Sequence, residues 1–485
     1  MPSSLTELQP TGLWKYFAKI LTIPHGSGNE KALGDYVVSV ARELKLDVKR
    51  DKVGNVIVSK PAAAGHENAP GVILQGHLDM VCEKNSDVVH DFLRDPIQAE
   101  IKGDWVQAKG TTLGADNGIG LAASLAVMED ASLVHGPLEF VFTVDEETGL
   151  TGANKLQKGS LKGTRLLNLD SEEEGTFTIG CAGGADSEIA VPLARRKTAS
   201  KNIYRLKISG LHGGHSGIDI NQGRANAIKL LARMLKEALS SGGGFELVGM
   251  EGGSKRNAIP REAWATLACA PAGRKAVAAS FKKSFAAIKI EYQAVEGDAK
   301  YSFEPAEETK ALALTADGQR GLLNYLLAIP HGVMAMHPEI KGLVETSTNL
   351  AIIRTAKAQV EIICSTRSSV ASALEATRLV LKAITEMAGA RINAKNGYPG
   401  WMPNLQSPLL ATLKSLYKAE FGVEATVAAI HAGLECGIIG EMFPGMDMIS
   451  FGPTLEHPHS PDERVNIATV AKFWRFIISA LAAMA

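Results

Sequence analysis

The chain has 485 residues, too many for a single ordinary hydrophobic core, and this length predicts roughly two to four domains. Hydrophobic residues make up 45% of the sequence and charged residues 21%, which is typical of a soluble globular enzyme. Because 51 lysines and arginines nearly balance 52 acidic residues, for a formal net charge of -1, bulk electrostatics favour neither nucleic acid nor a membrane as a partner.

The N-terminal segment and the cysteines indicate a cytoplasmic protein. Met1–Pro10 is polar and lacks the features of a secretion signal, and no stretch of the chain is apolar and long enough to span a bilayer. The cysteines are scattered, odd in number and form no CxxC pair; they are Cys82, Cys181, Cys269, Cys364 and Cys436. This pattern argues against a disulfide framework and against a thiolate zinc site. Any metal site must then use histidines and carboxylates.

The first part of the chain predicts alternating helices and strands. Apolar residues recur at helical spacing between Leu33 and Val40, which predicts an amphipathic helix over Glu30–Leu44, and the small apolar segment Asn117–Met128 predicts a second helix. Short apolar runs predict strands that are buried on both faces, namely Asn55–Ser59, Val72–Leu74, Leu138–Val144 and Leu166–Leu169. Strands interleaved with helices indicate an α/β layer architecture.

The sequence changes character near Ala185, and α/β character returns after Trp401 and ends in a predicted helix over Ile467–Met484. Between these points two similar blocks each lead into a predicted strand. The blocks and strands are Arg256–Pro260 with Ala263–Ala270 and Thr348–Ile352 with Gln359–Cys364, and long helices are predicted over Arg224–Leu239 and Ala371–Met387. We therefore predict a catalytic domain of residues 1–186 and 402–485, interrupted by one inserted domain, residues 187–401, that two similar halves could make up.

Two clusters near the start of the chain could bind metal. In His77-Leu78-Asp79, alternation along an extended segment places the two polar side chains on one side, so that His77 can bind a metal and Asp79 can orient an imidazole. Asp116, flanked by Gly114 and Gly118, stands just before a predicted helix, where it could bridge two cations. Each has a structural alternative: a loop histidine in the first cluster and a helix N-cap in the second.

Further acids and a histidine follow other predicted strands. Asp145, Glu146 and Glu147 come directly after Leu138–Val144, and three acids at a buried strand end repel one another unless a cation or a proton resolves the conflict. Asp170 ends another strand, whereas the acids at 172–174 are typical of a solvated face. His459 follows the strand-like run Met448–Phe451. A solvated acidic turn and a loop histidine are the structural alternatives.

Taken together, these histidines and carboxylates recur at the carboxyl ends of several strands, which is where ligands bind in open α/β sheets. Histidine and carboxylate ligands without a thiolate suit divalent metals such as zinc. Paired divalent metals are a common hydrolytic arrangement. The sequence therefore predicts a two-metal hydrolytic site.

The motifs resemble a known family in order and spacing over the whole chain. His77–Val81, Gly114–Asn117, Glu146-Glu147, Asp170 and His459–Glu463 resemble the zinc metallopeptidase family of carboxypeptidase G, aminoacylase and the carnosinases. Other blocks are similar to the bacterial Xaa-His (aminoacyl-histidine) dipeptidases of that family; they are Thr111–Gly120, Arg256–Glu262, Gly397–Trp401 and His431–Gly437. The resemblance implies a mixed-sheet di-zinc catalytic domain with a large inserted α+β lid domain.

The resemblance also implies a role for each residue of the metal site. His77 and Asp170 would bind one zinc ion, Glu147 and His459 would bind the other, and Asp116 would bridge both, followed by a cis peptide bond. Two zinc ions per chain are expected, although Co2+ or Mn2+ could use the same ligands.

The expected general base is Glu146, with Asp79 supporting the His77 side of the site. Glu146 would take a proton from a zinc-activated bridging water and pass it to the leaving amine. Asp145 departs from the family pattern because it lengthens the acid run, so a shift of this assignment by one residue stays open.

Residues of the predicted insert complete the site that the resemblance implies. His215, in Gly213–Gly217, would stabilise the tetrahedral oxyanion, and Arg367 would bind the free carboxylate of the substrate through two parallel hydrogen bonds. Asn257 and Glu435 are further substrate-pocket candidates. We expect the site to close between the two domains. A partner subunit, or a second half of the same insert, could supply the histidine, so a homodimer is compatible but not required.

The function implied is metal-dependent hydrolysis of small dipeptides, preferably Xaa-His dipeptides such as carnosine-like substrates. An N-acyl amino acid amidohydrolase or a carboxypeptidase of the same family is the first alternative, because the metal centre alone does not separate these activities. A metal-dependent binding protein without turnover is the second, and the presence of Glu146 argues against it.

Overall fold

The computed structural model describes residues 5–242, 244–306 and 312–485, so the first four residues of the polar N-terminal segment lie outside the described residues. The chain forms two compact units. The first comprises Met1–Cys181, Trp401–Ala429 and Leu434–Ala485, and the second comprises Ala182–Gly400 and Ile430–Gly433. No pattern in the sequence predicts that the four residues Ile430–Gly433 belong to the second unit.

An eight-stranded mixed sheet forms the centre of the first unit, in the order β1-β2-β6-β3-β7-β21-β8-β20. Its strands are β1 (Asp47–Arg50), β2 (Val56–Lys60), β3 (Val72–His77), β6 (Leu138–Thr143), β7 (Arg165–Asn168), β8 (Thr176–Cys181), β20 (Thr426–Ile430) and β21 (Asp447–Ser450). Strands β6, β3, β7 and β21 are parallel. Their carboxyl ends therefore meet at one edge of the sheet.

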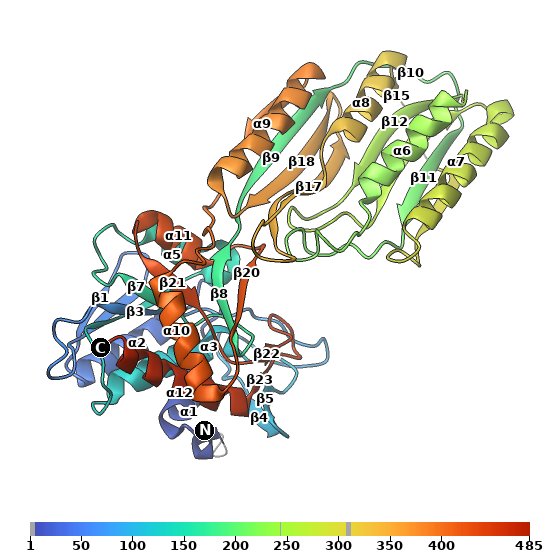
Figure 1. Ribbon diagram of the computed structural model, residues 1–485. Coiled ribbons are helices and arrows are strands. Elements are labelled where there is room, and N and C mark those ends of the chain that lie inside the picture. The colour runs from blue at the N-terminus through green and yellow to red at the C-terminus, as the bar shows by residue number, and fades with distance from the viewer. Residues whose placement is uncertain (1–4, 243, 307–311) are drawn as a thin grey trace. The chain divides into compact units, whose positions relative to one another are not determined.

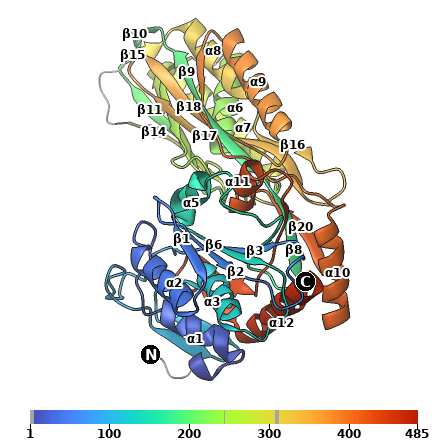
Figure 2. The same ribbon diagram turned by 90° about the vertical axis from the view of Figure 1, so that its left-hand side faces the viewer.

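Helices cover both faces of this sheet (Figure 2). One face carries α1 (Thr11–Ile20), α2 (Lys31–Glu43), α3 (Ala115–Glu129), α10 (Pro408–Phe421) and α12 (Ile467–Ala483), and the other carries α5 (Thr151–Lys155) and α11 (Glu435–Met442). Val72 and Leu74 of β3 pack in the first layer, whereas Ile73 packs with Ile439 of α11. Because side chains alternate along a strand, the continuous apolar runs are buried on both sides, as predicted.

A small second sheet in the same unit has no clear signal in the sequence. It has the order β22-β23-β5-β4 and is formed by β4 (Ala99–Lys102), β5 (Trp105–Ala108), β22 (Leu455–Glu456) and β23 (Arg464–Asn466). The loop between β22 and β23 carries His459. Two short helical turns, η1 (Leu5–Glu7) and α4 (Glu146–Gly149), complete the first unit.

The second unit is built on a nine-stranded antiparallel sheet whose main path is β14-β11-β13-β12-β17-β18-β9-β19. Its strands are β9 (Gly183–Pro192), β11 (Ile203–Ser209), β12 (Phe245–Gly252), β13 (Ala263–Cys269), β14 (Lys300–Pro305), β16 (Gly332–Met336), β17 (Val344–Thr355), β18 (Gln359–Ser368) and β19 (Arg391–Ala394). Four helices lie along one face of it (Figure 1): α6 (Ala227–Ser240), α7 (Pro271–Glu291), α8 (Ala316–Ala328) and α9 (Ala371–Met387). Two short strands, β10 (Arg195–Lys197) and β15 (Leu312–Leu314), form a separate antiparallel pair; β10 lies between β9 and β11 in the chain, and β15 lies between β14 and α8.

The strand order divides this sheet into two similar halves. β11-α6-β12-β13-α7-β14 has the spatial order β14-β11-β13-β12, and β9-α8-β17-β18-α9-β19 has the matching order β19-β9-β18-β17. The halves join where β12 pairs with β17. This topology agrees with the similar halves expected from the sequence, and β13 and β18 are indeed counterparts. The two helices singled out in the sequence, α6 and α9, are not counterparts, because α6 matches α8 and α9 matches α7.

Two expectations about the whole chain can be compared with the structure. All five cysteines are free. Among the described residues, no helix has both the length and the apolar character needed to cross a membrane.

Candidate metal centre and active site

The carboxyl edge of the parallel strands brings the predicted site residues of the first unit together. His77 is the last residue of β3, Glu146 and Glu147 form the turn α4 just after β6, and Asp170 follows β7. Asp116 lies in the first turn of α3, after a left-handed glycine at Gly114 that is the N-cap of that helix. The His459 loop reaches the same place from the small sheet.

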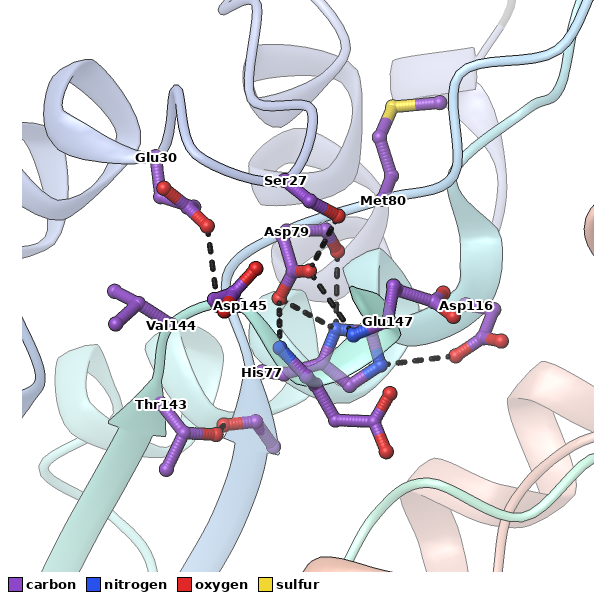
Figure 3. Close-up of polar contacts among 12 residues, drawn as sticks. Ser27, Glu30, His77, Asp79, Met80, Asp116, Thr143, Val144, Asp145 and Glu147 are labelled. Atoms are coloured by element: carbon purple, nitrogen blue, oxygen red, sulfur yellow. Dashed lines mark hydrogen bonds and ion pairs between the residues drawn. The ribbon is translucent and has the colours of Figure 1, made fainter. Parts of the chain in front are cut away.

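Asp116 lies between two groups of potential ligands. Its Oδ1 is 3.1 Å from His77 Nε2, which is 3.3 Å from Asp170 Oδ1. Its Oδ2 is 3.2 Å from His459 Nε2, which is 3.0 Å from Glu147 Oε2. Each group has ligand atoms within 4.8 Å of one another. The Asp116–Asn117 peptide bond is cis, as the resemblance implies, and Figure 3 shows the contact between His77 and Asp116.

These groups fit divalent cations on their own chemistry. His77 Nδ1 lies 3.0 Å from the backbone oxygen of Asp79, so the neutral ring carries its proton on Nδ1. The lone pair of Nε2 then faces the oxygens of Asp116 and Asp170. In addition, Glu147 Oε1 and Asp170 Oδ1 are buried without a hydrogen-bond partner among the described residues. Converging lone pairs of this kind require a proton or a cation, and nitrogen and oxygen donors suit zinc.

The electrostatics of the cluster show the same excess of negative charge. Burial raises the pKa of Asp170 to about 7, and Asp116 adds to the effect while His77 opposes it. Burial likewise raises the pKa of Glu146 well above its usual range, opposed by His77 and reinforced by Asp170. Hydrogen bonds to Asp116 and Glu147 raise the pKa of His459 to about 11. Positive charge is therefore strongly favoured here.

The carboxylate of Asp79 lies beside His77 and also holds the α4 turn. It accepts hydrogen bonds from the backbone N–H of Glu146 at 3.0 Å and of Glu147 at 3.2 Å, and from the Ser27 hydroxyl at 2.8 Å, whereas His77 Nδ1 is 3.5 Å away (Figure 3). Burial raises the pKa of Asp79, but His77 and these donors outweigh it and lower the value to about 2. Asp79 thus fixes the α4 turn, and its backbone oxygen orients the ring.

Asp145, the additional acid of the run, has its carboxylate directed at the hydroxyls of the following turn. Its carboxylate accepts hydrogen bonds from the hydroxyls of Thr148 and Thr151, and its backbone N–H donates to Glu30 at 3.0 Å. It is Glu147, and not Glu146, that contacts His459. This geometry favours the unshifted assignment of base and ligand.

Glu463 is a buried acid whose role the sequence did not predict. It is 2% exposed and accepts hydrogen bonds from four successive backbone N–H groups, those of Leu113, Gly114, Ala115 and Asp116, at 2.8, 3.0, 2.8 and 3.2 Å. Burial raises the pKa of Glu463 to about 7, opposed by these N–H groups and supported by Asp116. Its carboxylate therefore anchors the segment that presents Asp116. The only sequence signal was the His459–Glu463 motif itself.

Glu435, the first residue of α11, lies on the sheet face that α11 covers. Its Oε2 accepts hydrogen bonds from Gln75 at 2.6 Å and from Thr143 at 2.7 Å, while its buried Oε1 has no partner among the described residues. Thr143 is the direct neighbour of His77 in the parallel register. Burial raises the pKa of Glu435 to about 7.

The remaining predicted residues lie in the second unit. His215 follows β11, and its Nδ1 accepts hydrogen bonds from the backbone N–H of Gly217 at 3.3 Å and of Ile218 at 3.2 Å. Arg367, on β18, is 7% exposed, and its Nη2 lies 3.5 Å from His215 Nε2. Asn257 is exposed, and its backbone oxygen accepts from Ser216 at 2.8 Å in the same loop pairing. The two halves of the unit thus bring His215 and Arg367 together within one chain.

Comparison with known proteins identifies the family. The profile described as Peptidase family M20/M25/M40 matches residues 73–237 and 266–483, and the profile described as Peptidase dimerisation domain matches residues 206–294. The cytosol non-specific dipeptidase of Escherichia coli (strain K12) is 44% identical over 484 residues, which are 99% of each chain.

Solved structures agree with this result. The crystal structure of aminoacylhistidine dipeptidase from Vibrio alginolyticus is 44% identical, with a TM-score of 0.91 over 99% of this chain and 98% of that chain. Human carnosine dipeptidase 1 is 12% identical, with a TM-score of 0.50 over 97% and 95% of the two chains, and shares the fold. These matches confirm the expected mixed-sheet peptidase domain with an inserted α+β domain. The chain therefore belongs to peptidase family M20/M25/M40, a family of hydrolases, as the resemblance of its motifs predicts.

Proposed function

We propose that this enzyme is a two-metal dipeptidase that hydrolyses the single peptide bond of small dipeptides, with a preference for Xaa-His. The observation that carries the proposal is the carboxylate of Asp116, whose two oxygens face two separate groups of potential ligands. The names of the relatives from Escherichia coli and Vibrio alginolyticus support the substrate class. The word cytosol in the first name supports the cytoplasm as the location.

The proposed ligands divide as the resemblance implies. His77 and Asp170 would hold one cation, Glu147 and His459 would hold the other, and Asp116 would bridge them. We assign zinc to both positions, with Co2+ or Mn2+ as substitutes, because the donors are imidazole nitrogens and carboxylate oxygens. When bound, such cations make water more acidic and polarise the carbonyl of the scissile bond.

Glu146 is the proposed general base. It belongs to the same turn as Glu147, and Asp79 holds that turn by accepting hydrogen bonds from the backbone N–H groups of both residues. The Glu146 carboxylate lies within 4.8 Å of ligand atoms of His77 and Glu147. A carboxylate whose pKa is raised can accept the proton of the attacking water near neutral pH and then release it to the leaving amine.

Arg367 is the proposed recognition group for the carboxylate end of the substrate, and His215 is the proposed donor to the tetrahedral oxyanion. Because His215 Nδ1 accepts two backbone hydrogen bonds, the neutral ring carries its proton on Nε2. Burial and the charge of Arg367 lower the pKa of His215 and keep it neutral. His215 Nε2–H can therefore donate to the oxyanion, and the Arg367 guanidinium group, whose Nη2 lies 3.5 Å from it, can donate to the substrate carboxylate.

Glu435 and Asn257 are the remaining substrate candidates. Oε1 of Glu435, which has no hydrogen-bond partner among the described residues, is suited to the free α-ammonium group of a dipeptide, which an N-acyl amino acid lacks. Asn257 would line the pocket beside the His215 loop. The profile for a dimerisation domain supports a homodimer as part of the proposal, and the contact between His215 and Arg367 lies within the second unit of one chain.

A substrate panel tests the proposed function. The purified protein, loaded with zinc, is assayed on Xaa-His dipeptides, on matched dipeptides with other C-terminal residues, and on N-acyl amino acids. The proposal predicts turnover of dipeptides, fastest for C-terminal histidine. Faster turnover of N-acyl amino acids than of any dipeptide would replace it with an amidohydrolase, and equal turnover of all dipeptides would remove only the Xaa-His preference.

A further inference from the structure

We propose that Tyr398 is a positioning residue that fixes the guanidinium group of Arg367 for the carboxylate end of the substrate. This inference rests on the proposed function of Arg367 and deepens it. Tyr398 belongs to the block Gly397–Trp401, and none of the residues assigned above explains that block.

Tyr398 contacts Arg367 across Gly184 of the neighbouring strand β9, where no side chain stands between them. Arg367 on β18 is paired in register with Gly184 on β9. On the other side of Gly184, Tyr398 is held by two backbone hydrogen bonds, from Gly184 N–H to Tyr398 O at 3.0 Å and from Tyr398 N–H to Gly184 O at 2.9 Å. The Tyr398 hydroxyl accepts a hydrogen bond from Arg367 Nη1 at 2.8 Å.

Two glycines make room for the tyrosine ring. A Cβ atom at Gly184 would lie 2.6 Å from the Tyr398 hydroxyl oxygen, and a Cβ atom at Gly433 would lie 2.7 Å from the ring. Any side chain at either position would displace the tyrosine. Gly433 belongs to the block His431–Gly437, so two of the sequence blocks that mark the dipeptidases meet at this ring.

The contacts of the Arg367 guanidinium group indicate which of its N–H donors remain for a ligand. Within the described part of the chain, Nη1 is bound to Tyr398, Nη2 has only the 3.5 Å contact with His215, and Nε is buried without a hydrogen-bond partner. A carboxylate can accept from Nε and Nη2 through two parallel hydrogen bonds. Tyr398 holds the opposite side of the planar group, so the docking edge keeps one direction.

If Tyr398 only positions Arg367, its hydroxyl should affect substrate binding and not the chemical step. Tyr398 does not belong to the metal centre, and we infer that its hydroxyl acts on the substrate through Arg367. Loss of that hydroxyl should weaken binding of the substrate carboxylate in the ground state and the transition state alike. Such a loss raises KM and leaves kcat nearly unchanged.

The test compares Tyr398→Phe with the wild-type enzyme on a dipeptide and on the corresponding dipeptide amide, which has no carboxylate. We expect KM for the dipeptide to rise by about tenfold or more, because a hydrogen bond of a charged group is lost, with kcat within about twofold. Kinetics on the amide should be the same for both enzymes. Tyr325→Phe is the matched control, because it removes another buried hydroxyl contact of the second unit, to Thr385 at 2.9 Å, and should leave KM unchanged.

Equilibrium binding separates this inference from the proposed function. Calorimetry with free histidine and with histidinamide measures recognition of the carboxylate without turnover. Weaker binding of histidine, but not of histidinamide, by Tyr398→Phe supports the positioning role even if the wild type hydrolyses no dipeptide. An unchanged affinity for histidine, or an equal loss of kcat on the dipeptide and on its amide, would overturn it.

Discussion

Replacement of Glu463 by glutamine tests whether the protein holds Asp116 in place before any metal binds. The carboxylate accepts four backbone hydrogen bonds, two on each oxygen. Glutamine keeps one oxygen, and its amide nitrogen would face two N–H donors. With about 1.5–3 kcal/mol for each hydrogen bond to a charged group, the loss of two amounts to about 3–6 kcal/mol at the segment that carries Asp116.

The loss of these two hydrogen bonds should weaken the binding of metal, because Asp116 is the proposed bridging ligand. Groups that support a metal ligand typically contribute about 10–100-fold to affinity, so we expect zinc to bind Glu463→Gln about 10–100-fold more weakly than the wild type. Competition with a chromophoric chelator at pH 8, where Glu463 with its pKa of about 7 is ionised, measures this directly.

A matched control separates this effect from general destabilisation. Glu296 of the second unit is also 2% exposed, and it accepts backbone hydrogen bonds from His212 at 2.8 Å and from Ala225 at 2.9 Å. Glu296→Gln should lose a similar buried interaction without any change in zinc affinity. Unchanged zinc affinity in a folded Glu463→Gln protein would refute the reasoning.

Three other substitutions have distinct expected outcomes. Glu146→Gln should keep its zinc by metal analysis and lose about 10²–10⁴-fold in kcat, because it removes the base and not a ligand; full activity would exclude that role. Glu435→Gln should lower kcat/KM for dipeptides more than for their N-formyl derivatives, and an equal effect on both would exclude contact with the ammonium group. Burial, Arg367 and His215 lower the pKa of His431 from 6.5 to about 3, so below pH 6.5 the unfolded chain binds a proton that the folded chain does not. Relative to His431→Asn, the unfolding free energy of metal-free wild type in urea should therefore fall by about 1.4 kcal/mol per pH unit between pH 6.5 and pH 4, and a difference that does not vary with pH would contradict the shift.

Most of the first unit could be predicted because its signals are local. The run that forms β3 is apolar and short, and parallel strands buried on both faces have this pattern. His77, Glu147 and Asp170 stand at or just after strand ends, so chain order alone places them at one edge of the sheet. The position of Asp116 opposite both histidines required the family resemblance, because a helix N-cap has the same local sequence.

Most contacts of the residues that support the site could not be predicted, because they join residues that are distant in sequence. Glu463 bonds to a segment about 350 residues earlier, and nothing in its neighbours distinguishes it from a surface acid. The role of Asp79 in holding the α4 turn depends on how two strand ends approach each other, which periodicity does not describe. The Tyr398 ring fits only because Gly184 has no side chain. A glycine in a strand is equally typical of a β-bulge or a tight bend, so the sequence does not predict this contact.

The most direct test of a two-metal dipeptidase is a titration of the metal-depleted protein with zinc, followed by hydrolysis of an Xaa-His dipeptide after each addition. The shared carboxylate of Asp116 predicts no activity in the depleted protein and recovery that is complete at two zinc ions per chain. Asp116→Asn should lose that stoichiometry. Full recovery at one zinc ion, or undiminished hydrolysis by the depleted protein, would contradict the two-metal site.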